Sequence, residues 1–317
     1  MTPSSQMVAT MLTGYAASTA PKAVAINSAG LGFVSIEVGG TQTDADRTAL
    51  EACFIIGGRQ PCASLASGNT FAVDEVALPS SYTFSLAAPT ALIQIPYVTD
   101  AARASDITAY STLNKTKAIA ISLDGTVAAI HSTDTITNQA EANRIVLERC
   151  EMKAKMTPCT LFAEGATIVF DPATTNWAPQ IDYARRTVQI DLPGTTAANY
   201  ASHIPAYLSG LNQGYHGSIY LAADGAGGDA WQTNAALADT AALGFCNQYV
   251  TAGFRCFKYA SDRSIVMGPT SLAAYATKPV HCDAMPRVDC AAHKSMGCSA
   301  GSFYTTHAGG VALEACP

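Results

Sequence analysis

The chain has 317 residues, of which 49% are hydrophobic and only 13% are charged. This composition supplies enough apolar side chains for a core and excludes an intrinsically disordered chain. With 18 Lys and Arg against 24 Asp and Glu, the formal net charge is −6, which disfavours binding to nucleic acid or to an anionic membrane surface. The length predicts two or three structural units rather than one.

The N-terminal residues and the apolar runs indicate where the protein resides. No apolar run reaches the roughly 20 residues of a transmembrane helix, so we expect no membrane span. Residues 1–20 contain no Lys or Arg, and residues 7–20 belong to the first repeat described below. We therefore expect an exported protein whose signal peptide is absent from this chain.

A pattern of two apolar segments around a turn glycine occurs three times. Residues 22–27 (KAVAIN), 117–122 (KAIAIS) and, more loosely, 217–222 (GSIYLA) are each followed by Gly30, Gly125 or Gly225. Gly125 and Gly225 each follow an aspartate, and Asp-Gly between alternating apolar runs is a strong signal for a β-hairpin. Each pattern therefore predicts two antiparallel strands.

A helix that ends at a cysteine follows each predicted hairpin. Ala and Leu precede the cysteine by eight and three residues in every copy and so share one helical face. The cysteines are Cys53, Cys150 and Cys246. Residues near the start of each helix that can cap it are Asp44, Asn138 and Thr233.

A second cysteine opens the next predicted strand of each copy, at Cys62, Cys159 and Cys256. A final strand is expected at 69–73, 166–170 and 263–267. The unit therefore reads strand, strand, helix, strand, strand. Connector segments such as 91–98 (ALIQIPYV) and 186–193 (RTVQIDLP) are expected to add edge strands.

The cysteine positions fix the register of the repeat, because equivalent cysteines are 96 or 97 residues apart. The short spacing within each copy favours the local disulfides 53–62, 150–159 and 246–256 over free core thiols. Each would stabilise its module by about 2.5 to 3 kcal/mol in the chain-entropy model. Paired cysteines indicate an oxidising compartment.

We therefore predict an α+β protein of three tandem disulfide-stapled modules, each a helix on a small, mainly antiparallel sheet. The expected boundaries are 7–100, 101–195 and 196–270, followed by a cysteine-rich tail at 271–317.

The repeat resembles a widespread class of exported bacterial modules of unknown function. The resemblance rests on Lys-Ala-aliphatic-Ala-aliphatic-Ser/Asn, a turn glycine, an Ala-rich helix ending in Cys, and a Cys-led strand, found here at 22–73, 117–170 and, degraded, at 217–267. It implies the fold and an extracytoplasmic location, and it brings no catalytic residues. The third copy departs from the pattern because Gly217 replaces the lysine.

Residues 297–301 (GCSAG) match the G-x-S-x-G nucleophile elbow, with Ser299 as the candidate nucleophile and His307 or His293 as the base. An elbow needs a buried strand before the serine and a helix after it. The preceding residues do not form an apolar strand, so a turn around a disulfide is favoured over a catalytic site.

The tail cysteines Cys282, Cys290, Cys298 and Cys316 lie among His281, His293 and His307. Their spacings fit no standard zinc motif, so two disulfides of undetermined connectivity are favoured over a metal or redox site. No metal or cofactor is expected.

Three further groups were weighed as binding or catalytic residues. The glycine-rich segment 224–231 is interpreted as a hairpin turn, with Trp231 as a candidate surface-binding residue. Tyr15, Tyr110 and Tyr207 precede the first strand of their copies and fit core packing better than ligand stacking, although they stay surface-binding candidates. The acidic pairs Asp44–Asp46 and Glu148–Glu151 are interpreted as solvated helix faces.

The function expected from the sequence is non-catalytic. We expect binding or self-assembly at the cell surface, outside the cell or in the periplasm. The partner would be another copy of the chain, another extracellular protein or a glycan. A secreted serine hydrolase that uses Ser299, and a metal-binding or redox tail, are the alternatives.

Overall fold

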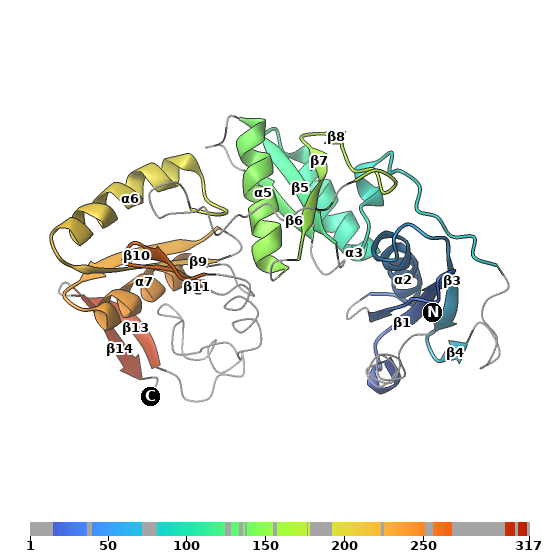
Figure 1. Ribbon diagram of the computed structural model, residues 1–317, viewed down its shortest axis with the longest axis horizontal. Helices are drawn as coiled ribbons and strands as arrows, with labels where there is room; N and C mark the ends of the chain where they lie inside the picture. Colours follow the sequence, from blue (N-terminus) through green and yellow to red (C-terminus); the bar gives the residue numbers. More distant parts are fainter. Residues whose placement is uncertain are drawn as a thin grey trace. The chain divides into compact units, whose positions relative to one another are not determined.

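The computed structural model describes residues 15–36, 40–71, 81–123, 128–132, 136, 138–154, 157–175, 177, 192–222, 225–250, 256–267, 302–307 and 310–315. Three modules with the same succession of strands and helix follow one another along these residues (Figure 1). The fold is α+β, as predicted, with small antiparallel sheets and one helix between the second and third strand of each unit.

The first module consists of β1 (Lys22–Asn27), β2 (Gly32–Ile36), α2 (Gln42–Ile56), β3 (Cys62–Ser67) and β4 (Thr70–Phe71). The second consists of β5 (Lys117–Ser122), β6 (Ala128–Ser132), α5 (Gln139–Lys153), β7 (Cys159–Glu164) and β8 (Thr167–Ile168). The third consists of β9 (His216–Ala222), β10 (Gly227–Gln232), α7 (Ala235–Tyr249), β11 (Cys256–Ser261) and β12 (Ser264–Ile265).

The three four-stranded sheets have the same strand order, β2-β1-β3-β4 in the first module and its equivalents in the others. The first strand of each module is central, which explains why its residues are almost all buried. The pairing of this strand with the third strand skips one residue in every copy, at Leu65, Phe162 and Tyr259. This β-bulge lies at the same repeat position each time, so it is a regular structural feature of the module.

The fourth strand is shorter than predicted, since only two residues pair in β4, β8 and β12. The connector prediction was wrong for residues 91–98, which form the 3₁₀ turn η1 (Leu92–Gln94) and a bend rather than an edge strand. The Ile-Pro step explains this, because Pro96 lacks the N–H that a strand ladder needs.

Further helices lead into the second and third modules. α3 (Asp100–Ala102), the π-helical turn η2 (Arg103–Ile107) and α4 (Thr108–Thr112) precede β5, and α6 (Ala197–Asn212) precedes β9. Residues 15–17 form a single helical turn before β1. In the tail, β13 (Ser302–His307) pairs with β14 (Gly310–Ala315).

The helices begin at side-chain caps. Thr41 and Asp44 form a capping box at α2, and Asn234 rather than the predicted Thr233 caps α7. Asn138 accepts the N–H of Ala140 at the start of α5, as expected. These caps satisfy N–H groups that have no partner inside a helix.

The described residues divide into two compact units. One holds those within 1–146 and 157–178, and the other those within 147–156 and 179–317, so the division falls inside α5. In the first unit, modules one and two share a core that includes Phe54, Tyr97 and Phe162. In the second, Tyr207, Ile219 and Tyr259 centre a core that also includes Met152 of α5.

Candidate functional site

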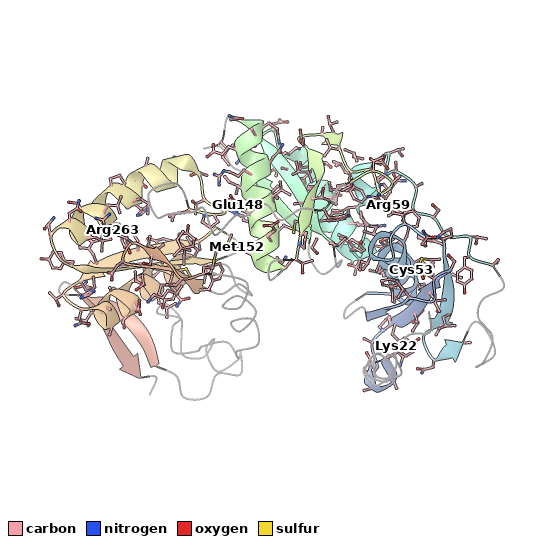
Figure 2. The ribbon with its side chains drawn as sticks, viewed as in Figure 1. Lys22, Cys53, Arg59, Glu148, Met152 and Arg263 are labelled. Atoms are coloured by element: carbon pink, nitrogen blue, oxygen red, sulfur yellow. A yellow bond between two sulfur atoms is a disulfide. The ribbon has the colours of Figure 1, made fainter. Side chains whose placement is uncertain are left out.

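The repeated lysines are buried and hold the end of the preceding helix. Lys117 Nζ donates to the carbonyls of Tyr110 at 2.6 Å and Leu113 at 2.8 Å, and it lies 4.6 Å from the centre of the Tyr110 ring. Lys22, which Figure 2 labels, donates in the same way to the carbonyls of Tyr15 and Ser18 and lies 4.8 Å from the centre of the Tyr15 ring. The Tyr110 carbonyl also accepts the N–H of Leu113, and the Tyr15 carbonyl that of Ser18. Each lysine therefore adds a further donor at the C-terminal end of its helix and is not an exposed reactive amine.

The repeated tyrosines close the hairpin between the third and fourth strands. The hydroxyls of Tyr15, Tyr110 and Tyr207 donate to the carbonyls of Gly68, Gly165 and Asp262 at 2.5, 2.8 and 2.8 Å. All three acceptors have positive φ, between 50° and 59°. Burial raises the pKa of Tyr110 and of Tyr207 well above the ordinary value, which keeps these hydroxyls protonated as donors.

The exposed fractions of the three tyrosines are at most 6%. Side chains buried to this degree cannot serve as stacking platforms for a ligand, so the surface-binding expectation is corrected for Tyr15, Tyr110 and Tyr207. Packing and turn closure, the alternative, describes all of them.

The third module lacks the lysine and uses a glycine instead. A Cβ at Gly217 would lie 2.6 Å from Cζ and Oη of Tyr207 and 2.7 Å from Cδ2 of Leu211. The helix before this strand is long and ends at Asn212, and Gly214, two residues later, has a φ of +88°. A glycine with positive φ terminates a helix by itself, so this copy has no need of a lysine cap.

A buried glutamate of α2 holds the connector that leads to the second module. Glu51 is 4% exposed, and its Oε2 accepts the backbone N–H of Tyr97 at 2.8 Å. Arg47 and Arg103 lie 3.1 and 3.6 Å from the same carboxylate. Arg47 also donates to the Val98 carbonyl at 2.6 Å. Burial raises the pKa of Glu51, while both arginines and the Tyr97 N–H oppose that shift.

The same contact recurs 97 residues later, at Glu148 of α5. Its Oε2 accepts the N–H of Gly194 at 2.7 Å, and Arg149 Nε donates to the carbonyl of Gly194 at 2.8 Å. Tyr97 and Gly194 both have positive φ, 66° and 71°. We call this repeated contact between helix glutamate and connector the joint. Glu148 and Met152 both lie on α5 (Figure 2).

The expectation of solvated acidic faces was therefore wrong for Asp44, Glu148 and Glu151, which are at most 1% exposed. Backbone N–H groups of the connectors bind the carboxylates of Asp44 and Glu148, which local sequence patterns do not reveal. A signal was present nonetheless: Glu51 and Glu148 precede their cysteines by two residues each, in register with the repeat, and Gly244 takes this place in the third copy.

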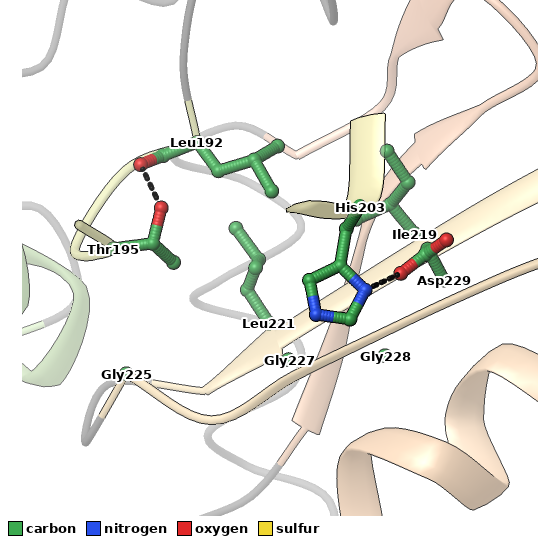
Figure 3. Close-up of a pocket in the computed structure, with 9 residues that line it drawn as sticks. All are labelled: Leu192, Thr195, His203, Ile219, Leu221, Gly225, Gly227, Gly228 and Asp229. Carbon is green, nitrogen blue, oxygen red and sulfur yellow. Dashed lines mark hydrogen bonds and ion pairs between the residues drawn. The ribbon is translucent and has the colours of Figure 1, made fainter. Parts of the chain in front are cut away.

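A hollow opens in the third module between α6, β9 and β10 (Figure 3). It measures about 420 Å³, including solvent at its mouth. Its apolar wall comes from Leu192, Ile219 and Leu221, and its polar side from an imidazole–carboxylate pair. His203 Nδ1 lies 3.1 Å from Asp229 Oδ1, with His203 61% and Asp229 14% exposed.

Asp229 is a substitution within the repeat, since the equivalent strand positions hold Val34 and Ile130. Burial raises the pKa of Asp229, and the nearby His203 opposes the shift. The described residues that line the hollow include neither Ser nor Cys, and the Thr195 hydroxyl donates to the Leu192 carbonyl. The pair can bind a small polar group, but these lining residues supply no activated serine or thiol.

The glycine-rich segment of the third module is part of the hairpin between β9 and β10, as predicted. A Cβ at Gly228 would clash with the backbone of Ala242 and Cys246 in α7, and one at Gly210 of α6 with the ring of Trp231. These glycines allow close packing of the helices on β10 rather than contact with a ligand. Trp231 is 36% exposed, so one part of its ring system remains accessible.

Two of the predicted local disulfides are formed as expected, Cys53–Cys62 and Cys246–Cys256. Cys150 and Cys159 of the second module are disulfide-bonded too. The tail candidates Ser299, His281 and His293, together with Cys282, Cys290, Cys298 and Cys316, lie outside the described residues. For His307, only the backbone position in β13 is described.

Comparisons with protein-family models, with curated proteins and with solved structures found no match to this chain. Among the helices that the structure describes, none is both long and apolar enough to cross a membrane.

Proposed function

We propose that this chain is a non-catalytic exported protein that acts by binding or self-assembly, at the cell surface, outside the cell or in the periplasm. The observation that carries the proposal is the use of the repeated polar side chains. The lysines cap helices, the tyrosines close hairpins and the glutamates hold connectors. Side chains engaged in this way maintain a scaffold, and the residues that the structure describes offer no other recurrent polar set for chemistry.

The compartment is inferred from the cysteines. Disulfides staple the helix to the third strand in the modules, and such bonds persist in oxidising compartments. The resemblance to exported bacterial modules points the same way. An exported scaffold with few charges would contact its partner mainly through apolar and neutral polar groups.

Exposed apolar side chains are available for such contact. Leu31, Ile93, Val169 and Val266 are each more than 40% exposed and are distributed over all three modules. The half-exposed Trp231 adds an indole, a group that stacks well on sugars and on other aromatic rings. The partner classes we propose are another copy of this chain, another extracellular protein or a glycan.

Light scattering coupled to size-exclusion chromatography, together with a glycan array, tests the proposal on the full chain. We expect a concentration-dependent oligomer or a reproducible glycan ligand. A strictly monomeric protein without a glycan or protein ligand would contradict it. Labelling by a fluorophosphonate that is lost in Ser299→Ala would favour the hydrolase instead.

A further inference from the structure

The hollow of the third module holds a polar pair that the repeated fold does not require. His203 comes from α6 and Asp229 from β10. The strand positions equivalent to Asp229 hold Val34 and Ile130. A carboxylate costs free energy of desolvation at a position that is apolar in the other two copies. The scaffold alone therefore does not account for the pair, which points to a role in binding.

Both side chains of the pair keep hydrogen-bonding capacity for a bound molecule. Figure 3 shows the imidazole extending from α6, with Nδ1 on Asp229 and the second ring nitrogen, Nε2, turned away from the carboxylate. Among the described residues, no group forms a hydrogen bond with Nε2 of His203. The carboxylate of Asp229 likewise binds no described side chain other than His203.

The other residues that line the hollow suit a small molecule with an apolar side. Leu192, Ile219 and Leu221 form the apolar wall, and Gly225 and Gly227 bring no side chain into the space. The volume of about 420 Å³ lies towards the lower end of the range of small-molecule sites, about 300–1,000 Å³. A single ring therefore fits this space better than a large ligand does.

The charges around the hollow favour a neutral ligand. Asp229 repels an anion. The guanidinium of Arg149 lies beside Gly225, since a Cβ there would collide with Nη2, and this charge repels a cation. Nε2 of His203 accepts a hydrogen bond in the neutral ring with its proton on Nδ1, and it donates one when the ring is protonated. A hydroxyl donates and accepts, so it matches the pair in either state.

An exposed indole lies on the same face of β10 as the pair. Alternate residues of a strand point to the same side, so Trp231 shares this face with Asp229. Its side chain lies against Gly210 of α6 and is 36% exposed. Trp231 does not line the hollow, but it offers a surface for stacking two residues away. Hydroxyl groups combined with a C–H face that packs on apolar and aromatic groups are the chemistry of a sugar.

We propose that the hollow of the third module binds one neutral sugar ring. Two neighbouring hydroxyls of the sugar bind the carboxylate of Asp229 and Nε2 of His203, and its C–H groups face the wall that includes Leu192. This inference rests on the proposed function, in which a glycan is one of the partner classes. It assigns glycan binding to a single site, because Val34 and Ile130 replace the carboxylate in the other modules.

Nuclear magnetic resonance of the histidine side chains in the full chain tests the site. The probes are glucose, galactose, mannose and N-acetylglucosamine at millimolar concentrations, with acetate and ethylammonium as charged probes. His203→Ala assigns the His203 signal. At least one sugar should shift this signal with saturation, whereas neither charged probe should.

Two variants connect the signal to the pair. Asp229→Val places in β10 the residue that the first module has there, and His203→Ala removes an exposed imidazole. Each should lower the affinity for the sugar at least tenfold. The matched control is His216→Ala, because His216 forms another exposed pair in the same module, with Nδ1 3.5 Å from Asp262 Oδ2. This control should bind the sugar with unchanged affinity.

Three outcomes would overturn the inference. The first is that none of the sugars shifts the His203 signal. The second is sugar binding of natural affinity in both Asp229→Val and His203→Ala, which would place the site elsewhere. The third is a saturable shift with acetate or ethylammonium alone. In each case the proposed function stands if the chain still self-associates in light scattering or binds a glycan on the array, so the two failures are distinguishable.

Discussion

The second and third modules begin with the same strand but support it differently. In the second, Lys117 reaches from β5 to the carbonyls at the end of the short helix α4. In the third, Gly217 occupies that position, and Tyr207 of the long helix α6 packs directly over it. The tyrosine hydroxyl donates to the same hairpin turn in both. The comparison shows that the lysine depends on the helix before it, as expected for a structural residue.

The same two modules differ at their C-terminal side. Glu148 of α5 captures Gly194, whereas α7 has Gly244 at the equivalent position. A joint thus occurs in the two modules that another module follows, and it is missing from α7, after which the tail begins. The buried glutamates Glu51 and Glu148 therefore occur on the helices that bind a connector to the next module.

The largest effect is expected from removal of the joint glutamates. Glu51→Ala removes the acceptor of the Tyr97 N–H and the buried carboxylate shared by Arg47 and Arg103, which keep only Asp44 and Asp100 as acidic partners. Loss of one partner of a buried pair costs about 3–5 kcal/mol. Glu148→Ala should act similarly. The free energy of unfolding, from denaturation followed by circular dichroism, measures it.

Glu164→Ala is the control, because Glu164 is a partly exposed residue of β7, and surface substitutions usually stay within about 0.5 kcal/mol. If Glu51→Ala were as stable as the control, the joint would contribute nothing to stability.

A side chain at Gly217 should have the next largest effect. The Cβ of Gly217→Ala would lie 2.6 Å from the Tyr207 ring, and overpacking of this kind costs about 1–3 kcal/mol. Thermal melting is the measurement. Gly227→Ala in the neighbouring strand is the control, since its Cβ would be 3.3 Å from Leu221. Equal melting temperatures for the two variants would argue against tight packing of Tyr207 on β9.

Replacement of each tyrosine by phenylalanine should cost less, about 1 kcal/mol for one lost hydrogen bond. The hydroxyls of Tyr15, Tyr110 and Tyr207 have the same role, so the three losses should be similar in urea denaturation. A large loss in one copy and none in another would show that the modules do not share this contact.

Acid should weaken the first module through Asp44. Burial raises the pKa of this carboxyl, but hydrogen bonds from Thr41, Asp100 and Arg47 outweigh burial and lower it to about 2. A lowered pKa in the folded state adds stability above about pH 4, which is lost as the pH falls towards 2. Glu51 acts in the opposite direction, because its pKa is raised.

Unfolding curves between pH 5 and 2 should therefore be flatter for Asp44→Asn than for the natural sequence. Parallel curves for the two proteins would exclude Asp44 as a source of the acid sensitivity.

The sequence predicted the succession of strands and helix in each module and the local disulfides, because turn glycines, apolar alternation and cysteine spacing are local signals. It did not predict the order of the strands within each sheet. It failed where long-range contacts decide. Asp44 and Glu148 lie on polar helix turns, and only the connectors that cover them make them buried. The pairing of His203 with Asp229 likewise depends on how α6 packs on β10. Residues 91–98 alternate like a strand, but Pro96 and a 3₁₀ turn prevent pairing.

Amide hydrogen exchange at Tyr97 and Gly194 tests the account most directly, since the central claim is that a helix glutamate holds each connector. In the natural sequence both amides should be protected. Glu51→Leu should lower protection at Tyr97 alone, and Glu148→Leu at Gly194 alone, because each carboxylate accepts one of these N–H groups and leucine offers no acceptor. Unchanged protection of both amides in both variants would contradict it.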